Sequence, residues 1–290
     1  MISGASIVSM LITFLVTGIF PIILMLVCAI IWRKKGFLPA WFLGAAGFFV
    51  MQIIIRLPMV SLISALPGFA VFVEKFYIVY VFVLALTAAL FEVVARFGVA
   101  KILQKNMNPE KGLATGLGHG GIEAMVLIGM TYVNNLIISV LINTGGFKDI
   151  MLQVVKVGPQ DAVQQLMEMQ RVLITTSPVL YLLAGYERIL TMIFHAAMSL
   201  LICYFVYKKK AIIGILLVTI AHFAVDFTAP LLQGLATPYL GNLISQTTSY
   251  ALVYAFLTVV AFVSFVIILL IMIIWKKEEK KRIAADEQTA

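Results

Sequence analysis

Three pairs of ionisable residues, with the members of each pair four positions apart, could do chemistry in this sequence. They are Glu92 with Arg96, His119 with Glu123, and His222 with Asp226. Residues four apart lie one turn from each other on one face of a helix. An arginine so placed favours the ionised form of its carboxylate, and a carboxylate fixes the tautomer of its histidine. Such groups can activate water and stabilise developing negative charge, which hydrolysis requires.

The remaining histidine, His195, also lies inside a long apolar segment. Ionisable groups are costly at membrane depth and are expected to face a bundle interior or a cavity. Counting from the nearest lysine cluster at ~1.5 Å per helical residue puts Glu92 and His119 ~14 and ~12 Å deep, and His222 and His195 ~18 and ~20 Å deep. A lone intramembrane histidine often serves packing alone, but four groups in one layer are expected to meet around one cavity.

The composition excludes a water-soluble globule. Apolar residues make up 62% of the 290 residues and charged residues 12%, whereas soluble domains have about 25% charged residues. The net charge of +8 does not indicate a nucleic-acid partner, because the basic residues cluster between apolar runs. We therefore expect one transmembrane domain over residues 1–275, with active-site spans at about 76–233, and a charged cytoplasmic tail over 276–290.

Seven segments are long enough to cross a bilayer. They are residues 5–32, 37–57, 76–100, 113–143, 178–207, 211–233 and 247–275. The predicted fold is an all-α polytopic helix bundle in the cell membrane. Fourteen lysines and arginines fall in the segments on one side and four in those on the other, so the amino terminus is expected outside and the carboxyl terminus inside.

Other features have simpler interpretations. Arg56, near one end of the second span, is expected to extend toward the membrane surface, and Glu187 with Arg188 to form a structural pair near the outer face. The external connection over 144–177 is expected to hold an interfacial helix beginning near Gly158-Pro159-Gln160-Asp161, which either rests on the membrane or gates the substrate.

The fourth span opens with four glycines in six residues, in Gly116-Leu117-Gly118-His119-Gly120-Gly121. Glycines weaken a helix but let another backbone or a substrate strand approach closely. A phosphate loop is excluded, because no Lys-Ser/Thr follows. Close approach to His119 is the expected role.

Several of these motifs resemble the YhfC family of intramembrane proteases, which is related to the CAAX-processing and bacteriocin-processing (CPBP) proteases. The matching elements are Phe91-Glu92-Val93-Val94-Ala95-Arg96, Gly118-His119-Gly120-Gly121-Ile122-Glu123-Ala124, Phe194-His195, and His222-Phe223-Ala224-Val225-Asp226. The motifs extend from residue 91 to 226, and the number of spans agrees with the family over the whole chain.

The resemblance implies cleavage of membrane-associated peptides or proteins within the bilayer, described for these relatives as glutamic-type. Glu92 takes the position of the water-activating glutamate, with Arg96 as the arginine of that motif. His119 or His195 would hold the same water. His222 and Asp226 match an element that stabilises the oxyanion.

Two departures from the family pattern concern these roles. The first motif in relatives usually has paired glutamates, and here Val93 or Phe91 replaces one of them, so Glu92 is the motif's only carboxylate. Asp226 stands where relatives have Asn or Asp, and it can donate to an oxyanion only when protonated. It could instead orient His222.

Alternatives remain at this point. The preferred interpretation requires no cofactor, but His119, His195 and His222 could instead hold zinc, although no HExxH motif occurs. Glu123 is the first alternative base. A proton-coupled transporter also uses buried ionisable groups, yet no inverted repeat is apparent. Haem binding by two histidines and a non-enzymatic scaffold are further possibilities.

Overall fold

The computed structural model describes residues 1–288, which contain helices and no strand. Seven helical stretches are long and apolar enough to cross a membrane, which confirms the predicted all-α polytopic fold. They are Gly4–Ile31, Phe37–Ser64, Tyr77–Asn106, Pro109–Thr144, Pro178–Tyr207, Ala211–Gly234 and Gln246–Lys281. The second extends beyond its predicted end at 57, because Pro58 stands in the first turn of a helix, where its missing N–H is tolerated.

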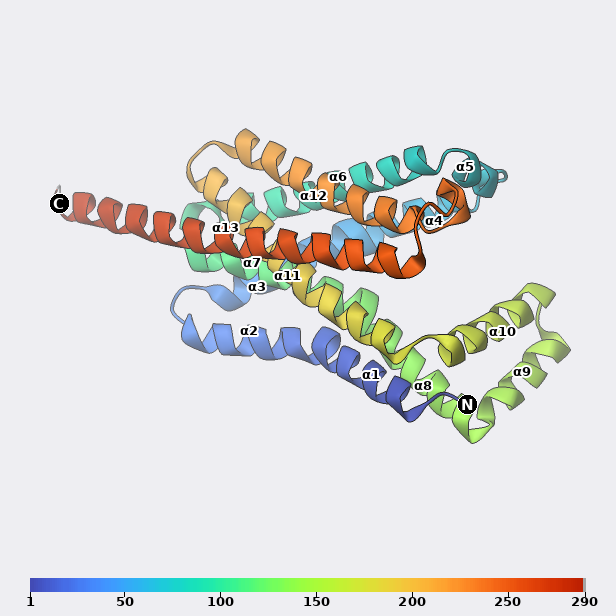
Figure 1. Cartoon of the computed structure of the whole chain (residues 1–290). Helices are drawn as coiled ribbons and strands as arrows, with labels where there is room; N and C mark the ends of the chain where they lie inside the picture. The colour runs from blue at the N-terminus through green and yellow to red at the C-terminus, as the bar shows by residue number, and fades with distance from the viewer. Residues whose placement is uncertain (289–290) are drawn as a thin grey trace. The chain divides into compact units, whose positions relative to one another are not determined.

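Several of the spans are built from more than one helical segment (Figure 1). Along the chain the elements are α1 (Gly4–Phe14), η1 (Leu15–Ile19), α2 (Phe20–Ile31), α3 (Phe37–Phe48), η2 (Phe49–Arg56), α4 (Leu57–Ser64), α5 (Phe69–Lys75), α6 (Tyr77–Leu103), η3 (Gln104–Asn106), α7 (Pro109–Glu123), η4 (Ala124–Gly129), α8 (Met130–Thr144), α9 (Gly146–Val157), α10 (Gln160–Thr175), α11 (Pro178–Tyr207), α12 (Ala211–Gly234), η5 (Pro238–Leu240) and α13 (Gln246–Gln288). The segments η1, η2 and η4 are π-helical.

The connection over 144–177 is more helical than expected. The predicted helix is present as α10 and begins at Gln160, directly after Pro159. A further helix, α9, precedes it and was missed by the sequence analysis; the left-handed Gly145 (φ 89°) stands at its amino-terminal end. The interfacial placement and the gating role of this region stay predictions.

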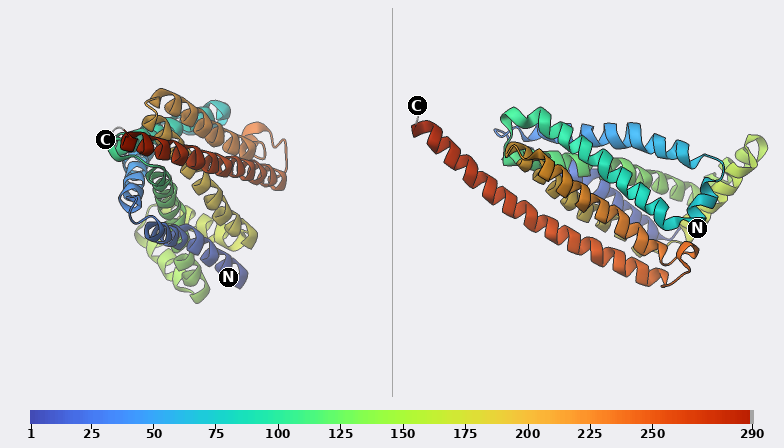
Figure 2. Two further views of the ribbon diagram at one scale, coloured as in Figure 1. Left: turned by 90° about the vertical axis from the view of Figure 1, so that its left-hand side faces the viewer. Right: turned by 90° about the horizontal axis from the view of Figure 1, so that it is seen from above.

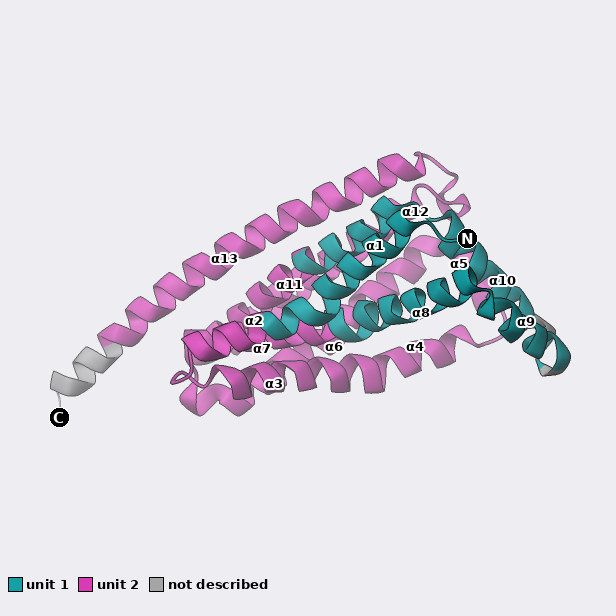
Figure 3. Ribbon diagram, turned by 90° about the horizontal axis from the view of Figure 1, so that it is seen from below, with its two compact units in different colours: residues 1–23, 124–189 teal, residues 24–123, 190–290 magenta. Residues whose placement is uncertain are grey.

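The chain divides into two compact units, which Figure 3 shows in different colours. Unit 1 comprises residues 1–23 and 124–189, and unit 2 comprises residues 24–123 and 190–290. All seven predicted site residues belong to unit 2, whereas Glu187 and Arg188 form an ion pair in unit 1. The single domain over 1–275 stays a prediction.

The basic clusters of unit 2 gather at one end of its helices. The contacts there join the Asn108 side chain to the Lys35 carbonyl oxygen (3.0 Å), Glu110 to Lys276 (3.3 Å), and Lys208 to Glu278 (3.0 Å). We call this the basic end. The location of all four basic clusters at this end agrees with their placement at one membrane face. The outside location of the amino terminus stays a prediction.

The last helix forms part of unit 2. It lies beside α12 and extends past it at its carboxyl end (Figure 2). The buried Trp275 of α13 packs in a core with Leu200 and Cys203 of α11. The expected tail over 276–290 begins as a continuation of this helix, and residues 289 and 290 lie outside the described part of the chain.

The glycines of α7 bring its backbone against two neighbouring helices of unit 2. A Cβ atom on Gly118 would lie 2.0 Å from the carbonyl oxygen of Trp41 in α3, and one on Gly116 would lie 2.5 Å from Cα of Ala196 in α11. Side chains cannot occupy such spaces. The expected close approach is therefore made by other helices of the chain, and it fixes the position of α7 beside α11.

Candidate active site

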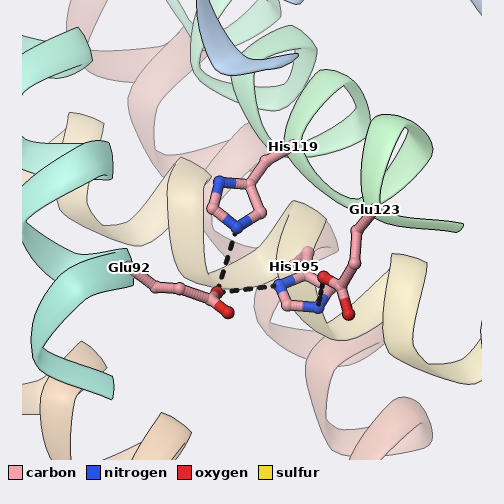
Figure 4. Close-up of side chains that lie close together, drawn as sticks. All are labelled: Glu92, His119, Glu123 and His195. Atoms are coloured by element: carbon pink, nitrogen blue, oxygen red, sulfur yellow. Dashed lines mark hydrogen bonds and ion pairs between the residues drawn. The ribbon is translucent and has the colours of Figure 1, made fainter. Parts of the chain in front are cut away.

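The carboxylate of Glu92 lies at the centre of a buried polar cluster in unit 2. Its Oε2 atom is 3.0 Å from Nε2 of His119, 3.2 Å from Nε2 of His222 and 3.7 Å from Nδ1 of His195. Figure 4 shows Glu92, His119 and His195 pointing toward one another from α6, α7 and α11. Each of the four side chains belongs to a residue at most 5% exposed. The structure thus brings together the four groups that share a predicted depth.

Arg96 connects two members of this cluster. Its Nη1 forms an ion pair with Glu92 Oε2 at 2.9 Å, and its Nη2 lies 2.6 Å from Nδ1 of His195. Its Nε donates to Oγ of Ser199 at 3.2 Å. Because a guanidinium can only donate, Nδ1 of His195 accepts. The proton of the neutral ring is then on Nε2, which faces Glu123 Oε2 at 2.8 Å (Figure 4).

The second members of the two histidine pairs lie at the edge of the cluster. Asp226 Oδ2 is 3.3 Å from Nε2 of His222, and the side chain of Asp226 is 31% exposed. Glu123, whose side chain is 13% exposed, contacts Nε2 of His195 in α11. Both carboxylates are one helical turn farther from the basic end than their histidines. The two pairs therefore differ in role: Asp226 faces its own pair partner, and Glu123 joins two helices.

A pocket adjoins the cluster on the side of the basic end. Its lining includes Arg96, His119, Thr115 and Ser199. Arg96, Thr115 and Ser199 each lie one helical turn nearer the basic end than Glu92, His119 and His195, respectively. Water has polar partners there, since a guanidinium, an imidazole and two hydroxyl groups face the same space.

Gln52 is the residue of this site that the sequence analysis missed. Its Nε2 donates to Oε1 of Glu92 at 2.9 Å, and the residue is 4% exposed. A glutamine amide is neutral, so it does not stand out among the charged and imidazole groups of the spans. The available signal was an amide in an apolar run, four residues before Arg56 and thus at the spacing of the other pairs.

Arg56 has hydrogen-bond partners that the sequence analysis did not identify, and its extension toward the membrane surface stays a prediction. Its guanidinium donates to the Leu84 carbonyl oxygen at 2.8 Å and to Oε1 of Gln52 at 3.3 Å. These contacts tie the second span to α6. The physical reason is local, because a half-buried guanidinium is stabilised by acceptors within its reach, here a backbone carbonyl and an amide oxygen.

Four of these residues could hold a metal ion. Glu92, His119, Glu123 and His195 each offer one ligand atom, and these atoms lie within 4.8 Å of one another. Two imidazole nitrogens and two carboxylate oxygens are the donor types of catalytic zinc sites, so the residues present fit a divalent ion. This group differs from the expected set of His119, His195 and His222. His222 contacts Glu92 but is not part of the compact group, which contains the carboxylates of Glu92 and Glu123 instead.

The comparison with known proteins identifies the family of the chain. The sequence model of the YhfC intramembrane metalloprotease family matches residues 19–244, and the chain belongs to that family, as its motifs predicted. It is also 27% identical over 188 residues to the uncharacterized membrane protein YhfC of Bacillus subtilis (strain 168), a match that covers 62% of this chain and 69% of that protein. No solved structure matches. The chain is therefore a multi-pass membrane hydrolase of peptide bonds.

Proposed function

We propose that the chain is a metal-dependent intramembrane protease in which His119, Glu123 and His195 hold a divalent ion and Glu92 accepts a proton from water. The observation that carries this proposal is the compact group of four ligand atoms within 4.8 Å, buried in spanning helices. The description of the family as metalloproteases also favours it. On this basis the metal-dependent alternative replaces the glutamic mechanism as the preferred interpretation.

The division of roles follows from the number and surroundings of the groups. Catalytic zinc sites use three protein ligands, so one of the four candidates is available for other work. Glu92 is suited to act as the base. Arg96 compensates its negative charge through an ion pair, which leaves the carboxylate oxygens free of any covalent or coordinate bond. A divalent ion at this position supplies a Lewis acid that activates water and polarises a peptide carbonyl.

The remaining groups stabilise charge and orient one another. His222 presents Nε2 to both Glu92 Oε2 and Asp226 Oδ2, at 3.2 and 3.3 Å. Before substrate binds, Asp226 accepts from this Nε2–H and orients His222, which requires no proton on its carboxylate. The same N–H can donate to the oxyanion that forms on the substrate carbonyl once it is released from the carboxylates.

Glutamic-type catalysis is the second candidate, and one observation favours it. With Arg96 donating to Nδ1, His195 carries its proton on Nε2. His195 can offer that nitrogen to an ion only after the contact with Arg96 is given up. In the present arrangement Glu92, Arg96 and the imidazoles could activate water by themselves.

Metal analysis of active protein separates the two mechanisms. A substrate is first identified by comparing the membrane proteomes of cells with wild type and Glu92→Gln, as peptides that accumulate or vanish. Purified protein is then dialysed against a chelator and assayed with that substrate. We expect loss of the bound ion and of activity together, with recovery on adding Zn²⁺. Full activity in metal-free protein would establish the glutamic mechanism instead, and no cleavage by wild type would contradict the protease assignment.

A further inference from the structure

Gln52 holds one oxygen of the Glu92 carboxylate while the ionisable groups share the other. The amide Nε2 donates to Oε1 at 2.9 Å. Oε2 has Arg96, His119 and His222 within 3.2 Å. The two oxygens of this base are therefore chemically distinct, and a neutral donor is what distinguishes them.

The orientation of the amide is determined by Arg56. Nη1 of Arg56 donates to Oε1 of Gln52 at 3.3 Å, and a guanidinium has no acceptor. The amide oxygen must therefore face Arg56, which leaves the NH₂ group to face Glu92. A glutamine flipped by 180° would set two donors against each other and an oxygen against a carboxylate.

Arg56 is itself anchored on the helix that carries Glu92. Its Nη2 donates to the carbonyl oxygen of Leu84 at 2.8 Å and lies 3.4 Å from Oγ1 of Thr87. Both residues belong to α6. The chain of hydrogen bonds thus leaves α6, passes through Arg56 and Gln52, and returns to α6 at Glu92. Such a closed path fixes the rotation of the carboxylate relative to its own helix.

The local backbone presents Gln52 and Arg56 together. Both lie in the π-helix η2, and the carbonyl oxygen of Gln52 accepts from the N–H of Leu57, five residues later. π-Bulges are rare and occur frequently at functional sites. The preceding helix can approach α6 closely because Gly47 faces Ala95 and Val99, where a Cβ atom would lie 3.0 Å from the valine side chain.

We propose that Gln52 is a positioning residue for peptide hydrolysis: it holds Oε1 of Glu92 so that Oε2 is the atom that takes the proton from water. This inference rests on the proposed role of Glu92 as base. A neutral amide is suited to the task, since it orients the carboxylate without adding the positive charge that would weaken a base. Arg56 acts one step behind by holding the amide.

The test uses the full-length protein and the substrate identified above. Gln52→Met keeps the length of the side chain and removes the donor, and we expect kcat to fall about tenfold to a hundredfold, the value of one hydrogen bond to a charged group. KM should stay within about twofold of wild type. Gln233→Met, the same change at an exposed position of α12, is the matched control and should keep wild-type kcat.

A second variant supplies a readout that a merely structural role would not change. Gln52→Glu puts a carboxyl group against Glu92, and two carboxylates in contact ionise together only with difficulty. While the pair shares a proton the donor is restored, so kcat should exceed that of Gln52→Met at low pH and fall toward it as pH rises. The other charged and titratable groups around Glu92 are the same in both variants. They are Arg56, Arg96, His119, Glu123, His195, His222 and Asp226. Equal pH profiles for the two variants would contradict the inference.

An infrared measurement separates the contact from the chemistry. The carboxylate band of Glu92 is isolated as the difference between wild type and Glu92→Gln, and should shift in Gln52→Met but not in Gln233→Met. Wild-type kcat in Gln52→Met, together with an inactive Glu92→Gln, would overturn the positioning role and leave the protease proposal standing. Wild-type activity in Glu92→Gln would overturn both the positioning role of Gln52 and the assignment of Glu92 as the base.

Discussion

Nη2 of Arg96 lies 2.6 Å from Nδ1 of His195. Because arginine can only donate, this contact makes Nδ1 an acceptor and leaves the ring proton on Nε2, toward Glu123. One guanidinium in α6 thereby sets the tautomer of an imidazole in α11, while its other nitrogens pair with Glu92 and Ser199. Arg96 is thus both a counter-ion and a geometric link among helices.

Removing the base should abolish most of the activity. Glu92→Gln keeps the shape of the side chain but removes its basicity, and a general base contributes roughly 10²–10⁴-fold. We expect turnover to fall at least about a hundredfold, with substrate binding retained. Glu187→Gln in unit 1 is the control, because it removes a carboxylate that takes no part in the cluster, and it should remain active.

Replacing Arg96 tests its two functions separately. Arg96→Leu leaves a buried carboxylate without its counter-ion, which typically costs about 3–5 kcal/mol of stability. Arg96→Lys keeps the charge near Glu92 but lacks the fork that reaches His195 and Ser199 together. Unfolding in detergent should therefore show a large loss of stability for Arg96→Leu and a smaller loss for Arg96→Lys. We expect kcat to be reduced in both variants. Equal stability of leucine variant and wild type would argue against the buried ion pair.

Metal content should distinguish the two possible sets of ligands. If His119, Glu123 and His195 hold the ion, His119→Ala should lower the bound metal sharply, whereas His222→Ala should keep it and lose activity. Elemental analysis of the purified variants measures this directly. Equal loss of metal in both variants would restore His222 to the ligand set that the sequence suggested.

A single methyl group on α7 should displace the site. In Gly118→Ala the added Cβ meets the Trp41 carbonyl oxygen at 2.0 Å, so α3 and α7 must separate. Overpacking of this kind costs about 1–3 kcal/mol or more, and His119 would move with its helix. Gly98→Ala in α6 is the matched control, since its Cβ meets nothing within 4 Å, and it should stabilise the helix by about 0.5–1 kcal/mol. Thermal unfolding and cleavage rates of the pair test this expectation.

Much of the fold could be predicted from the amino-acid order alone. The spans follow from local hydrophobicity, because a bilayer demands about 20 apolar residues in succession whatever the neighbouring helices do. The shared layer of Glu92, His119, His195 and His222 follows from their depths. Each depth is obtained by counting residues along a single helix from the nearest lysine cluster. The family also followed from short motifs, which lie within the matched residues 19–244.

Only the tertiary structure decided which groups touch. Gln52 reaches Glu92 because the π-helix η2 turns it toward α6, and Glu123 contacts His195 because glycines bring α7 against α11. Both outcomes depend on the rotation of a helix about its axis and on the distance to its neighbour. Those quantities are set by packing between segments distant in the chain, which depth and spacing within a single helix do not contain.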